Sequence, residues 1–442
     1  MGGLFGIFNT PENISPAQTV FFGLHALQHR GQDGCGIAVN DDGTIVYHKD
    51  LGMVSTVFND TVIANLGGGK TAIGQVRSAD EKSNTRENTQ PLVTKYHKGT
   101  LSIIMNGNVI NSDKLRAELE DAGVMFQTTS DAELIANLVS RERLSSSSID
   151  EALQKAMKKI HGGYAIVIMS PSKLIAARDP HGYRPLVIGE LDGSTIFTSE
   201  TVACDAVGAK VVRDVLPGEV VVVNRDGLQP YRDNCGNQSK ICVFEYMYFA
   251  RPDSVIEDES VYEVRKRAGE LLAADSPVAA DLVIGVPDSG ISAAIGYSEK
   301  SGIPYGAGLI KNKYVAREFV SAVKGDTIRI KLNALKSAVN GKRVIMVDDS
   351  IIRGASGRYI VQLLRNAGAK EVHVRVASPK FLYECNYGTV FPPMDTYAAQ
   401  KYTDEEFVKE IGADSLAFLG LDRLEQIKPG GFCDGCFSGK YI

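Results

Sequence analysis

The sequence has no apolar run long enough to cross a membrane and no secretory signal. No stretch of about 18 consecutive apolar residues occurs, which argues against a membrane-spanning helix. Residues 1–12 lack both the basic segment and the long apolar segment of a signal peptide. We therefore expect a cytoplasmic protein without a membrane partner.

The sequence has no net positive charge and few cysteines. The net charge is -5 at pH 7 and no long basic tract occurs, which argues against nucleic acid as a partner. Small anions remain possible ligands, because loops and helix N-termini bind them without net positive charge. Cysteine is unevenly spaced, at positions 35, 204, 235, 242, 385, 433 and 436. Reduced thiols or metal ligands are therefore expected rather than a disulfide framework.

The length of 442 residues predicts two domains, because single cores stop growing near roughly 250 to 300 residues. Short strands such as 101–105 and 163–169 are expected in the first half, each followed by turn residues, with helices over 16–29 and 130–144. Ser148 or Asp150 is expected to cap a further helix. A polar stretch ends near residue 240, which predicts domains of residues 1–235 and 236–442.

The second half alternates between strand and helix patterns. Strands are expected over 281–286, 343–347 and 371–377, with helices over 291–301 and about 358–366 between them. Such alternation predicts a doubly wound parallel sheet, whose ligands sit at the carboxyl ends of the strands.

Two adjacent acids, Asp348 and Asp349, end one of these strands, and a turn with Ser350, Arg353 and Gly354 follows. Carboxylates can hold ribose hydroxyls or Mg²⁺, and N–H groups at a helix start can hold a phosphate. The alternative is an ordinary turn in which Asp349 and Ser350 cap the helix. The full string closely resembles the phosphoribosyl pyrophosphate (PRPP) motif of type I phosphoribosyltransferases.

A second loop, 287–290, follows a neighbouring strand and by itself would be only a turn. It continues through residues 291–297 and 308–315 into a run that resembles the amidophosphoribosyltransferases, also called glutamine PRPP amidotransferases. The resemblance extends over essentially the whole chain, through segments 3–7, 27–33, 178–182, 243–246 and 437–441.

The resemblance implies an α/β and α+β protein. An N-terminal nucleophile (Ntn) hydrolase-like αββα sandwich, the glutaminase, precedes a type I phosphoribosyltransferase doubly wound sheet. The family makes 5-phosphoribosylamine for purine biosynthesis from PRPP and the ammonia released from glutamine. The implied partners are small molecules, namely PRPP, ammonia or another amine, and nucleotide effectors, and a homo-oligomer is expected.

The resemblance also implies site residues. PRPP would be held by Pro287, Asp288, Ser289, Gly290, Asp348, Asp349, Ser350, Arg353, Gly354 and Ser356, with Mg²⁺ on Ser289, Asp348 and Asp349. A [4Fe–4S] cluster would be held by Cys242, Cys385, Cys433 and Cys436, as in the iron–sulfur subgroup. The residues alone leave a Cys₄ zinc site open as an alternative.

The glutaminase nucleophile of the family is a cysteine activated by its own α-amino group. Gly2 stands at that position, so no catalytic residue is expected in the glutaminase half. Of the former glutamine pocket, the residues that match the family are Arg77, Asn106, Gly107 and Asp131. Residues 78–80 and Met105 depart from the family pattern, and the retained residues can serve the fold alone.

The transferase half departs from the family pattern too. The loop over 317–330 looks shortened, and residues 355–357 read Ala-Ser-Gly where the family has Thr-Thr-Ser. Two functions therefore stay open. One is an enzyme that transfers phosphoribosyl to ammonia or another amine, and the other is a non-catalytic regulator that binds PRPP or nucleotide.

Overall fold

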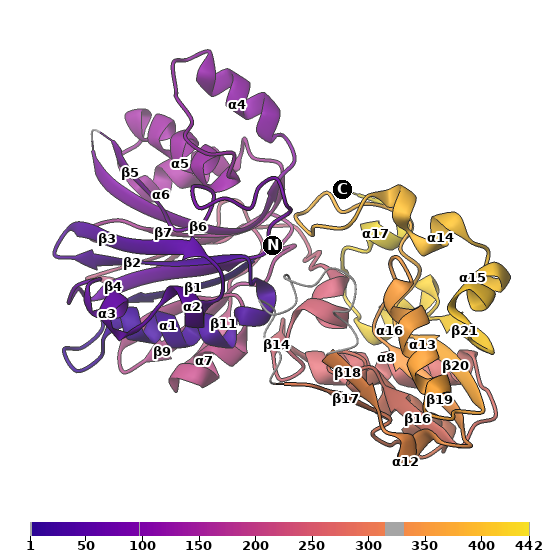
Figure 1. Ribbon diagram of the computed structural model, residues 1–442. Helices are drawn as coiled ribbons and strands as arrows, with labels where there is room; N and C mark the ends of the chain where they lie inside the picture. The colour runs from indigo at the N-terminus through magenta and orange to yellow at the C-terminus, as the bar shows by residue number, and fades with distance from the viewer. Residues whose placement is uncertain (1, 97, 314–330, 442) are drawn as a thin grey trace.

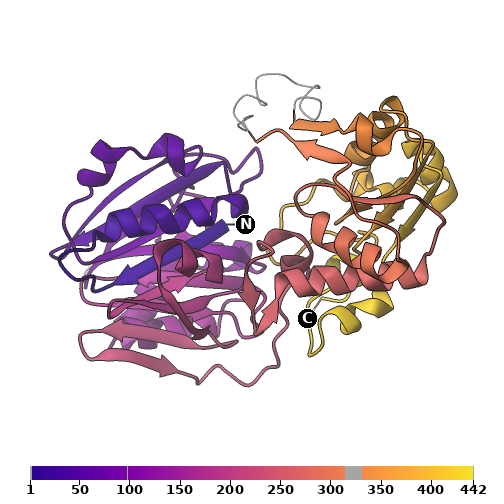
Figure 2. The ribbon, with the colours of Figure 1, turned by 90° about the horizontal axis from the view of Figure 1, so that it is seen from below.

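The computed structural model describes residues 2–96, 98–313 and 331–441. They form two halves that lie side by side, indigo to magenta and orange to yellow in Figures 1 and 2. We call residues 2–231 the N-terminal half and residues 241–441 the C-terminal half. Within the described part of the chain, no helix is long and apolar enough to span a membrane.

The N-terminal half contains two antiparallel sheets. The first has the strand order β11 (Lys210–Asp214), β9 (Val187–Leu191), β10 (Ser194–Thr198), β1 (Gly2–Phe8), β4 (Thr71–Arg77), β2 (Gly34–Asp41), β3 (Thr44–Leu51). The second has the order β13 (Gly227–Tyr231), β12 (Val220–Asn224), β8 (Leu174–Arg178), β7 (Gly162–Met169), β6 (Gly99–Val109), β5 (Leu92–Tyr96).

The two sheets pack face to face, and helices cover both outer faces (Figure 1). Because side chains alternate along a strand, β1 is apolar on both faces. Leu4 and Phe8 pack against the second sheet, whereas Phe5 and Ile7 pack with the helices. The covering helices are α1 (Pro16–Ala26) and α7 (Thr201–Val207) on one side and α5 (Asp131–Glu142) and α6 (Ile149–Met157) on the other. The half is therefore the expected αββα sandwich.

Local sequence signals set several element boundaries. The hydroxyl of Ser148 accepts a hydrogen bond from the N–H of Glu151 and caps α6, as predicted. The prediction that a turn follows Met105 is wrong, because β6 continues to Val109 in register with β7. Gly107 makes this continuation possible with a φ of 134°, a conformation that residues with a Cβ rarely adopt.

The C-terminal half is built on a parallel sheet in the order β16 (Leu282–Gly285), β19 (Arg343–Asp348), β20 (Glu371–Val376), β21 (Ser415–Phe418). Ile345 and Val347 pack on one face with α8 (Val261–Asp275) and α9 (Ile291–Ser301). Val344 and Met346 pack on the other with α13 (Ala355–Asn366). Helices on both faces confirm the doubly wound sheet.

Shorter elements complete the fold. They are α2 (Val54–Val57), α3 (Asp60–Ala64), α4 (Ser112–Glu120), β14 (Val255–Ile256), β15 (Glu259–Ser260), β17 (Leu309–Lys311), β18 (Leu332–Ala334), α12 (Lys336–Val339), α14 (Ala398–Lys401), α15 (Asp404–Ile411), α16 (Leu424–Ile427) and α17 (Gly435–Ser438). A π-helix, η3 (Glu245–Phe249), opens the C-terminal half.

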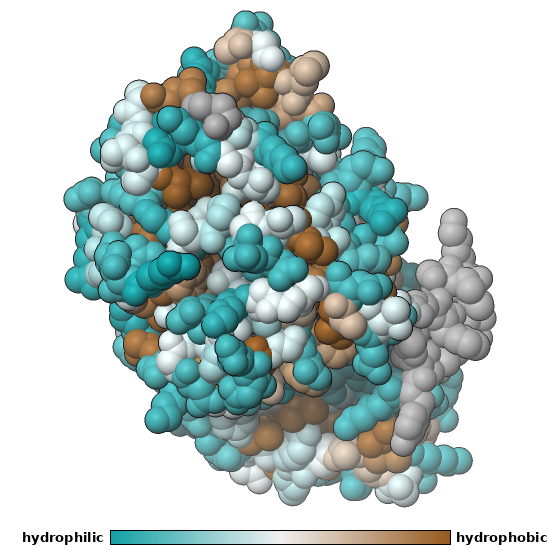
Figure 3. All heavy atoms as spheres, turned by 90° about the vertical axis from the view of Figure 1, so that its left-hand side faces the viewer, coloured by the Kyte–Doolittle hydropathy of each residue, from teal (hydrophilic) through white to brown (hydrophobic). Residues whose placement is uncertain are grey.

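The face of the N-terminal half that points away from the C-terminal half is mostly hydrophilic (Figure 3). Apolar residues there form small separate patches rather than one continuous band. Scattered patches of this kind are normal on a folded protein and identify no site. The candidate sites lie instead at the strand ends of the C-terminal half and between the two halves.

Candidate functional site

Two loops at the carboxyl ends of β16 and β19 bring a serine and two acids together. The hydroxyl of Ser289, in the loop after β16, donates a hydrogen bond to the carboxylate of Asp349, which follows β19. Asp348 is 8% exposed and Asp349 is 7% exposed. The three residues that the sequence predicts as Mg²⁺ ligands therefore converge at one edge of the sheet.

Burial makes it costly for this acid pair to carry two charges. Burial and the neighbouring charge of Asp349 raise the pKa of Asp348 well above its ordinary value. Burial also raises the pKa of Asp349, although hydrogen bonds from Ser289 and Ser350 and the positive charge of Arg265 oppose the increase. A bound cation would favour the ionised form of both carboxylates.

A cavity of about 800 Å³ opens over these acids. The start of α13 forms another part of its wall, and the first N–H groups of a helix are suited to bind phosphate. Gly354 precedes the helix with a φ of 84°, and no side chain caps it. The alternative that Asp349 and Ser350 cap this helix is therefore wrong. The predicted PRPP residues in the cavity wall are Ser289, Asp348, Asp349, Ser350, Arg353, Gly354 and Ser356.

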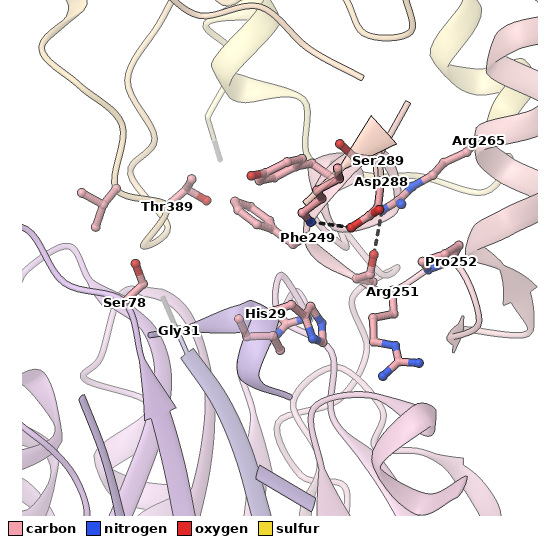
Figure 4. Close-up of a pocket in the computed structure, with 15 residues that line it drawn as sticks. His29, Gly31, Ser78, Phe249, Arg251, Pro252, Arg265, Asp288, Ser289 and Thr389 are labelled. Atoms are coloured by element: carbon pink, nitrogen blue, oxygen red, sulfur yellow. Dashed lines mark hydrogen bonds and ion pairs between the residues drawn. The ribbon is translucent and has the colours of Figure 1, made fainter. Parts of the chain in front are cut away.

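Three predicted PRPP residues do not line this cavity. Asp288 lines a second cavity of about 460 Å³ between the two halves and forms an ion pair of 2.5 Å with Lys311 (Figure 4). Gly290 precedes α9 and packs closely against β19, since a Cβ there would lie 2.5 Å from the carbonyl oxygen of Val347. Pro287 lines neither cavity.

Several wall residues were not predicted from the sequence. Tyr248, Phe249, Thr389 and Val390 line both the strand-end cavity and the cavity between the halves. Arg265 on α8 lines the second cavity and donates hydrogen bonds to the carbonyl oxygens of Tyr246 and Ala250, at 2.6 and 2.7 Å. No local pattern marks these residues, because they come from segments far apart in the chain.

A third cavity, of about 300 Å³, is lined by three of the four residues that match the glutamine pocket, and Asn106 is the exception. Arg77, Gly107 and Asp131 line it. Arg77 donates a hydrogen bond to the carbonyl oxygen of Ser83 at 3.0 Å. Burial raises the pKa of Asp131, although its carboxylate accepts a hydrogen bond from the N–H of Val109. Asp80, one of the departures from the family, lines the same cavity.

The position of the missing nucleophile is tightly filled. The N–H of Gly2 donates to Oδ1 of Asn106 at 2.9 Å. A Cβ on Gly2 would lie 2.6 Å from the carbonyl oxygen of Val76 and 3.1 Å from Nε2 of Gln75. Among the described residues, Nδ2 of Asn106 and Oε1 of Gln75 find no hydrogen-bond partner. The site therefore has neither a thiol nor space for one.

The four predicted cluster cysteines lie near one another. Cys242 and Cys433 form an isolated parallel β-bridge. Burial and the nearby charges of Cys242, Cys385 and Cys433 raise the pKa of Cys436 well above its ordinary value. All four thiols are free of disulfides. Within the described ranges, no group of three or more candidate ligands is arranged for a single metal ion. The shortened loop predicted over 317–330 lies outside the described residues.

The fold and the site define a class of two-domain proteins. In this class an Ntn glutamine-amidotransferase sandwich is joined to a phosphoribosyltransferase domain built on a parallel sheet. Residues 78–206 match the family described as a glutamine amidotransferase domain. The amidophosphoribosyltransferase of Methanocaldococcus jannaschii is 42% identical, over 100% of this chain and 97% of that protein. That of Synechocystis is 44% identical, over 99% of this chain and 90% of that protein.

A solved structure has the same architecture. The glutamine PRPP amidotransferase from B. subtilis, in complex with ADP and GMP, matches with a TM-score of 0.92 and 42% identity. The match covers 99% of this chain and 97% of that chain. The chain therefore belongs to the amidophosphoribosyltransferase family, whose members are glycosyltransferases.

Proposed function

We propose that the protein transfers the phosphoribosyl group of PRPP to ammonia or another amine, and that it has no glutaminase activity of its own. The observation that carries this proposal is the contrast between its two halves. Ser289, Asp348 and Asp349 converge in an open cavity of about 800 Å³. Position 2, in contrast, lacks both a nucleophile and room for a side chain.

Each part of the cavity has a role in this reaction. The carboxylates of Asp348 and Asp349 accept hydrogen bonds from the ribose hydroxyls, and the N–H groups of Ser356 and Gly357 receive the 5-phosphate. Mg²⁺, which Ser289, Asp348 and Asp349 would hold, supplies positive charge that stabilises the departing pyrophosphate. The amine nitrogen bonds to C1 of the ribose as the bond from C1 to the pyrophosphate oxygen breaks, and the amine then loses a proton.

The predicted cluster ligands form a second part of the proposal. Cys242, Cys385, Cys433 and Cys436 are free of disulfides and near one another, two of them buried and two half-buried, which fits a thiolate-bound metal group. We infer a [4Fe–4S] cluster in preference to zinc because these four positions match the cysteines of the family's iron–sulfur subgroup. Its role would be to attach the C-terminal segment 433–436 to Cys242. Nucleotide effectors and a homo-oligomer also stay predictions.

Calorimetric titration with PRPP and Mg²⁺ tests the transferase site. Replacing Asp349 with alanine should weaken PRPP binding by about one to two decades, because one charge-assisted contact is lost. Asp422→Ala, which removes an exposed carboxylate that does not line the cavity, is the matched control and should bind as the parent does. Circular dichroism establishes that both variants are folded.

Turnover with ammonium salt separates the enzyme from the regulator. The parent should consume PRPP with ammonium present and should release no glutamate from glutamine. PRPP binding without turnover would favour the non-catalytic regulator. No binding at millimolar PRPP would show that the altered loops have abolished the site.

A further inference from the structure

A fully buried cluster of charged residues crosses the boundary between the two halves. Arg30, Arg184 and Glu200 come from the N-terminal half and Glu245 from the C-terminal half, and all four are 0% exposed. Arg30 bonds to both carboxylates, while its Nε donates to the carbonyl oxygen of Gly2 at 3.1 Å. Arg184 bonds to Glu245 at 3.2 Å. Every charge in the cluster therefore has an opposite partner.

The two carboxylate oxygens of Glu200 contact different halves of the protein. Its Oε1 accepts hydrogen bonds from Arg30 and from Nε2 of His29. Its Oε2 accepts one from the N–H of Arg251 at 2.9 Å and one from the hydroxyl of Ser254 at 2.6 Å. One carboxylate thus joins the N-terminal half to a turn of the C-terminal half, residues 250–254.

That turn directly follows η3, the π-helix that carries Tyr248 and Phe249. Both rings line the strand-end cavity as well as the cavity between the halves. In Figure 4, Phe249, Arg251 and Pro252 stand around the same cavity as His29. Arg265 holds the same segment from the opposite side, through the carbonyl oxygens of Tyr246 and Ala250. The segment is therefore fixed from both halves.

The contacts of Glu200 are of the strong kind. Burial by itself would raise the pKa of Glu200, but Arg30, His29 and Ser254 more than offset it and hold the pKa well below its ordinary value. Glu200 is therefore ionised, and its hydrogen bonds to Arg251 and Ser254 are charge-assisted. The carboxylate cannot be exchanged for a neutral side chain without loss of hydrogen bonds.

We propose that Glu200 is a positioning residue for the transferase site, holding the turn 250–254 so that Tyr248 and Phe249 keep their places between the two cavities. This role rests on the proposed transfer reaction and requires no nucleophile. It gives the N-terminal half a function that survives the loss of glutaminase chemistry, because one wall of the transferase site is held from that half.

Hydrogen exchange tests the positioning directly and needs no activity. In Glu200→Gln, an amide nitrogen replaces one of the two carboxylate oxygens. Either Arg30, or Arg251 and Ser254 together, then lose the oxygen that accepts their hydrogen bonds. Peptides covering 246–254 should exchange at least about tenfold faster than in the parent. Ser254→Ala leaves the buried ion pairs intact and should give a smaller change in the same peptides, should the first variant not fold.

Thr201→Val is the matched control, because Thr201 also crosses the boundary, accepting a hydrogen bond from the N–H of Val255 at 3.0 Å. It should leave exchange over 246–254 unchanged. Unchanged exchange in Glu200→Gln and Ser254→Ala, or equal acceleration in Thr201→Val, would overturn the positioning role.

Kinetics separate positioning from general stability. Glu200→Gln should raise the KM for ammonia roughly tenfold, because Tyr248 and Phe249 line the cavity between the halves as well as the strand-end cavity. The Kd for PRPP should rise by no more than about twofold, because the loops that hold PRPP belong to the C-terminal half's own sheet. A Kd for PRPP and a KM for ammonia that rise by the same factor would contradict the proposal. A parent without ammonia-dependent turnover would count against the proposed function, and the exchange result would then decide the role of Glu200.

Discussion

Replacing Gly2 with cysteine would supply the missing thiol, yet we expect no glutaminase activity in this variant. The new Cβ would lie 2.6 Å from the carbonyl oxygen of Val76, a backbone atom of the paired strand β4. Relief therefore requires β1 and β4 to move apart within a close-packed sandwich. Overpacking of this kind costs about 1 to 3 kcal/mol.

The surroundings of position 2 would not help such a thiol. Gln75, whose Nε2 would be 3.1 Å from the new Cβ, donates a hydrogen bond to the carbonyl oxygen of Met105. Oδ1 of Asn106 is occupied by the N–H of Gly2. Asp80 lines the former glutamine pocket together with Arg77, and its negative charge favours the charged form of Arg77. Asp80 would therefore compete with the carboxylate of a substrate for the Arg77 guanidinium.

Glutamate release from glutamine, in protein free of contaminating amidases, measures the outcome. Gly2→Ala is the matched control, because it adds the Cβ without the thiol. Both variants should melt below the parent, by about 2 to 4 °C for each kcal/mol lost in a domain of this size, and neither should release glutamate. Glutamine hydrolysis by Gly2→Cys alone would refute the reasoning, and melting temperatures equal to the parent's would refute the packing argument.

Two further predictions concern the metal group and the boundary between the halves. Protein purified without oxygen should be brown with about four irons per chain, and Cys436→Ser should lose them while Cys235→Ser keeps them; about one zinc per chain would contradict the cluster. Asp214→Asn should raise the urea midpoint at pH 7.5, because burial, outweighing Arg178 and reinforced by Glu257, raises the pKa of Asp214 to about 6. Since this folded pKa exceeds the unfolded value of 3.8, ionisation of Asp214 destabilises the folded protein. Asp214→Asn should therefore raise the free energy of unfolding by up to about 3 kcal/mol above pH 6, and this increase should vanish as the pH falls towards 4. An equal gain at both pH values would refute the assignment to Asp214.

Local signals in the sequence predicted much of the fold. Helix α9 begins and ends where its pattern indicates, and Ser148 caps α6, because such features depend on residues a few positions apart. The prediction of a turn after Met105 was wrong because contacts distant in the sequence outweighed the local signal. An Asn-Gly pair favours a turn locally, but eight pairings with β7 hold β6 extended through it, from Ser102 to Val109.

The candidate site was likewise predictable from the sequence only in part. The two acids at the end of β19 and the serine in the loop after β16 could be assigned from the sequence, because both loops leave the carboxyl ends of parallel strands, which meet at one edge of the sheet. The position of Asp288 at the cavity between the halves was not predictable, because that cavity exists only where the second half meets the first.

By itself, the sequence determined the alternating strands and helices of the second half and the absence of a cysteine at position 2, which are read from neighbouring residues. The αββα sandwich and the PRPP motif followed from the resemblance of its segments to a known family. Only the tertiary structure decided whether that position could accept a side chain, because the opposing atom belongs to Val76. It also decided that Glu200 contacts Arg251 and Ser254, about 50 residues away in the chain. Contacts of this kind form only when the two halves pack together, and no local pattern encodes them.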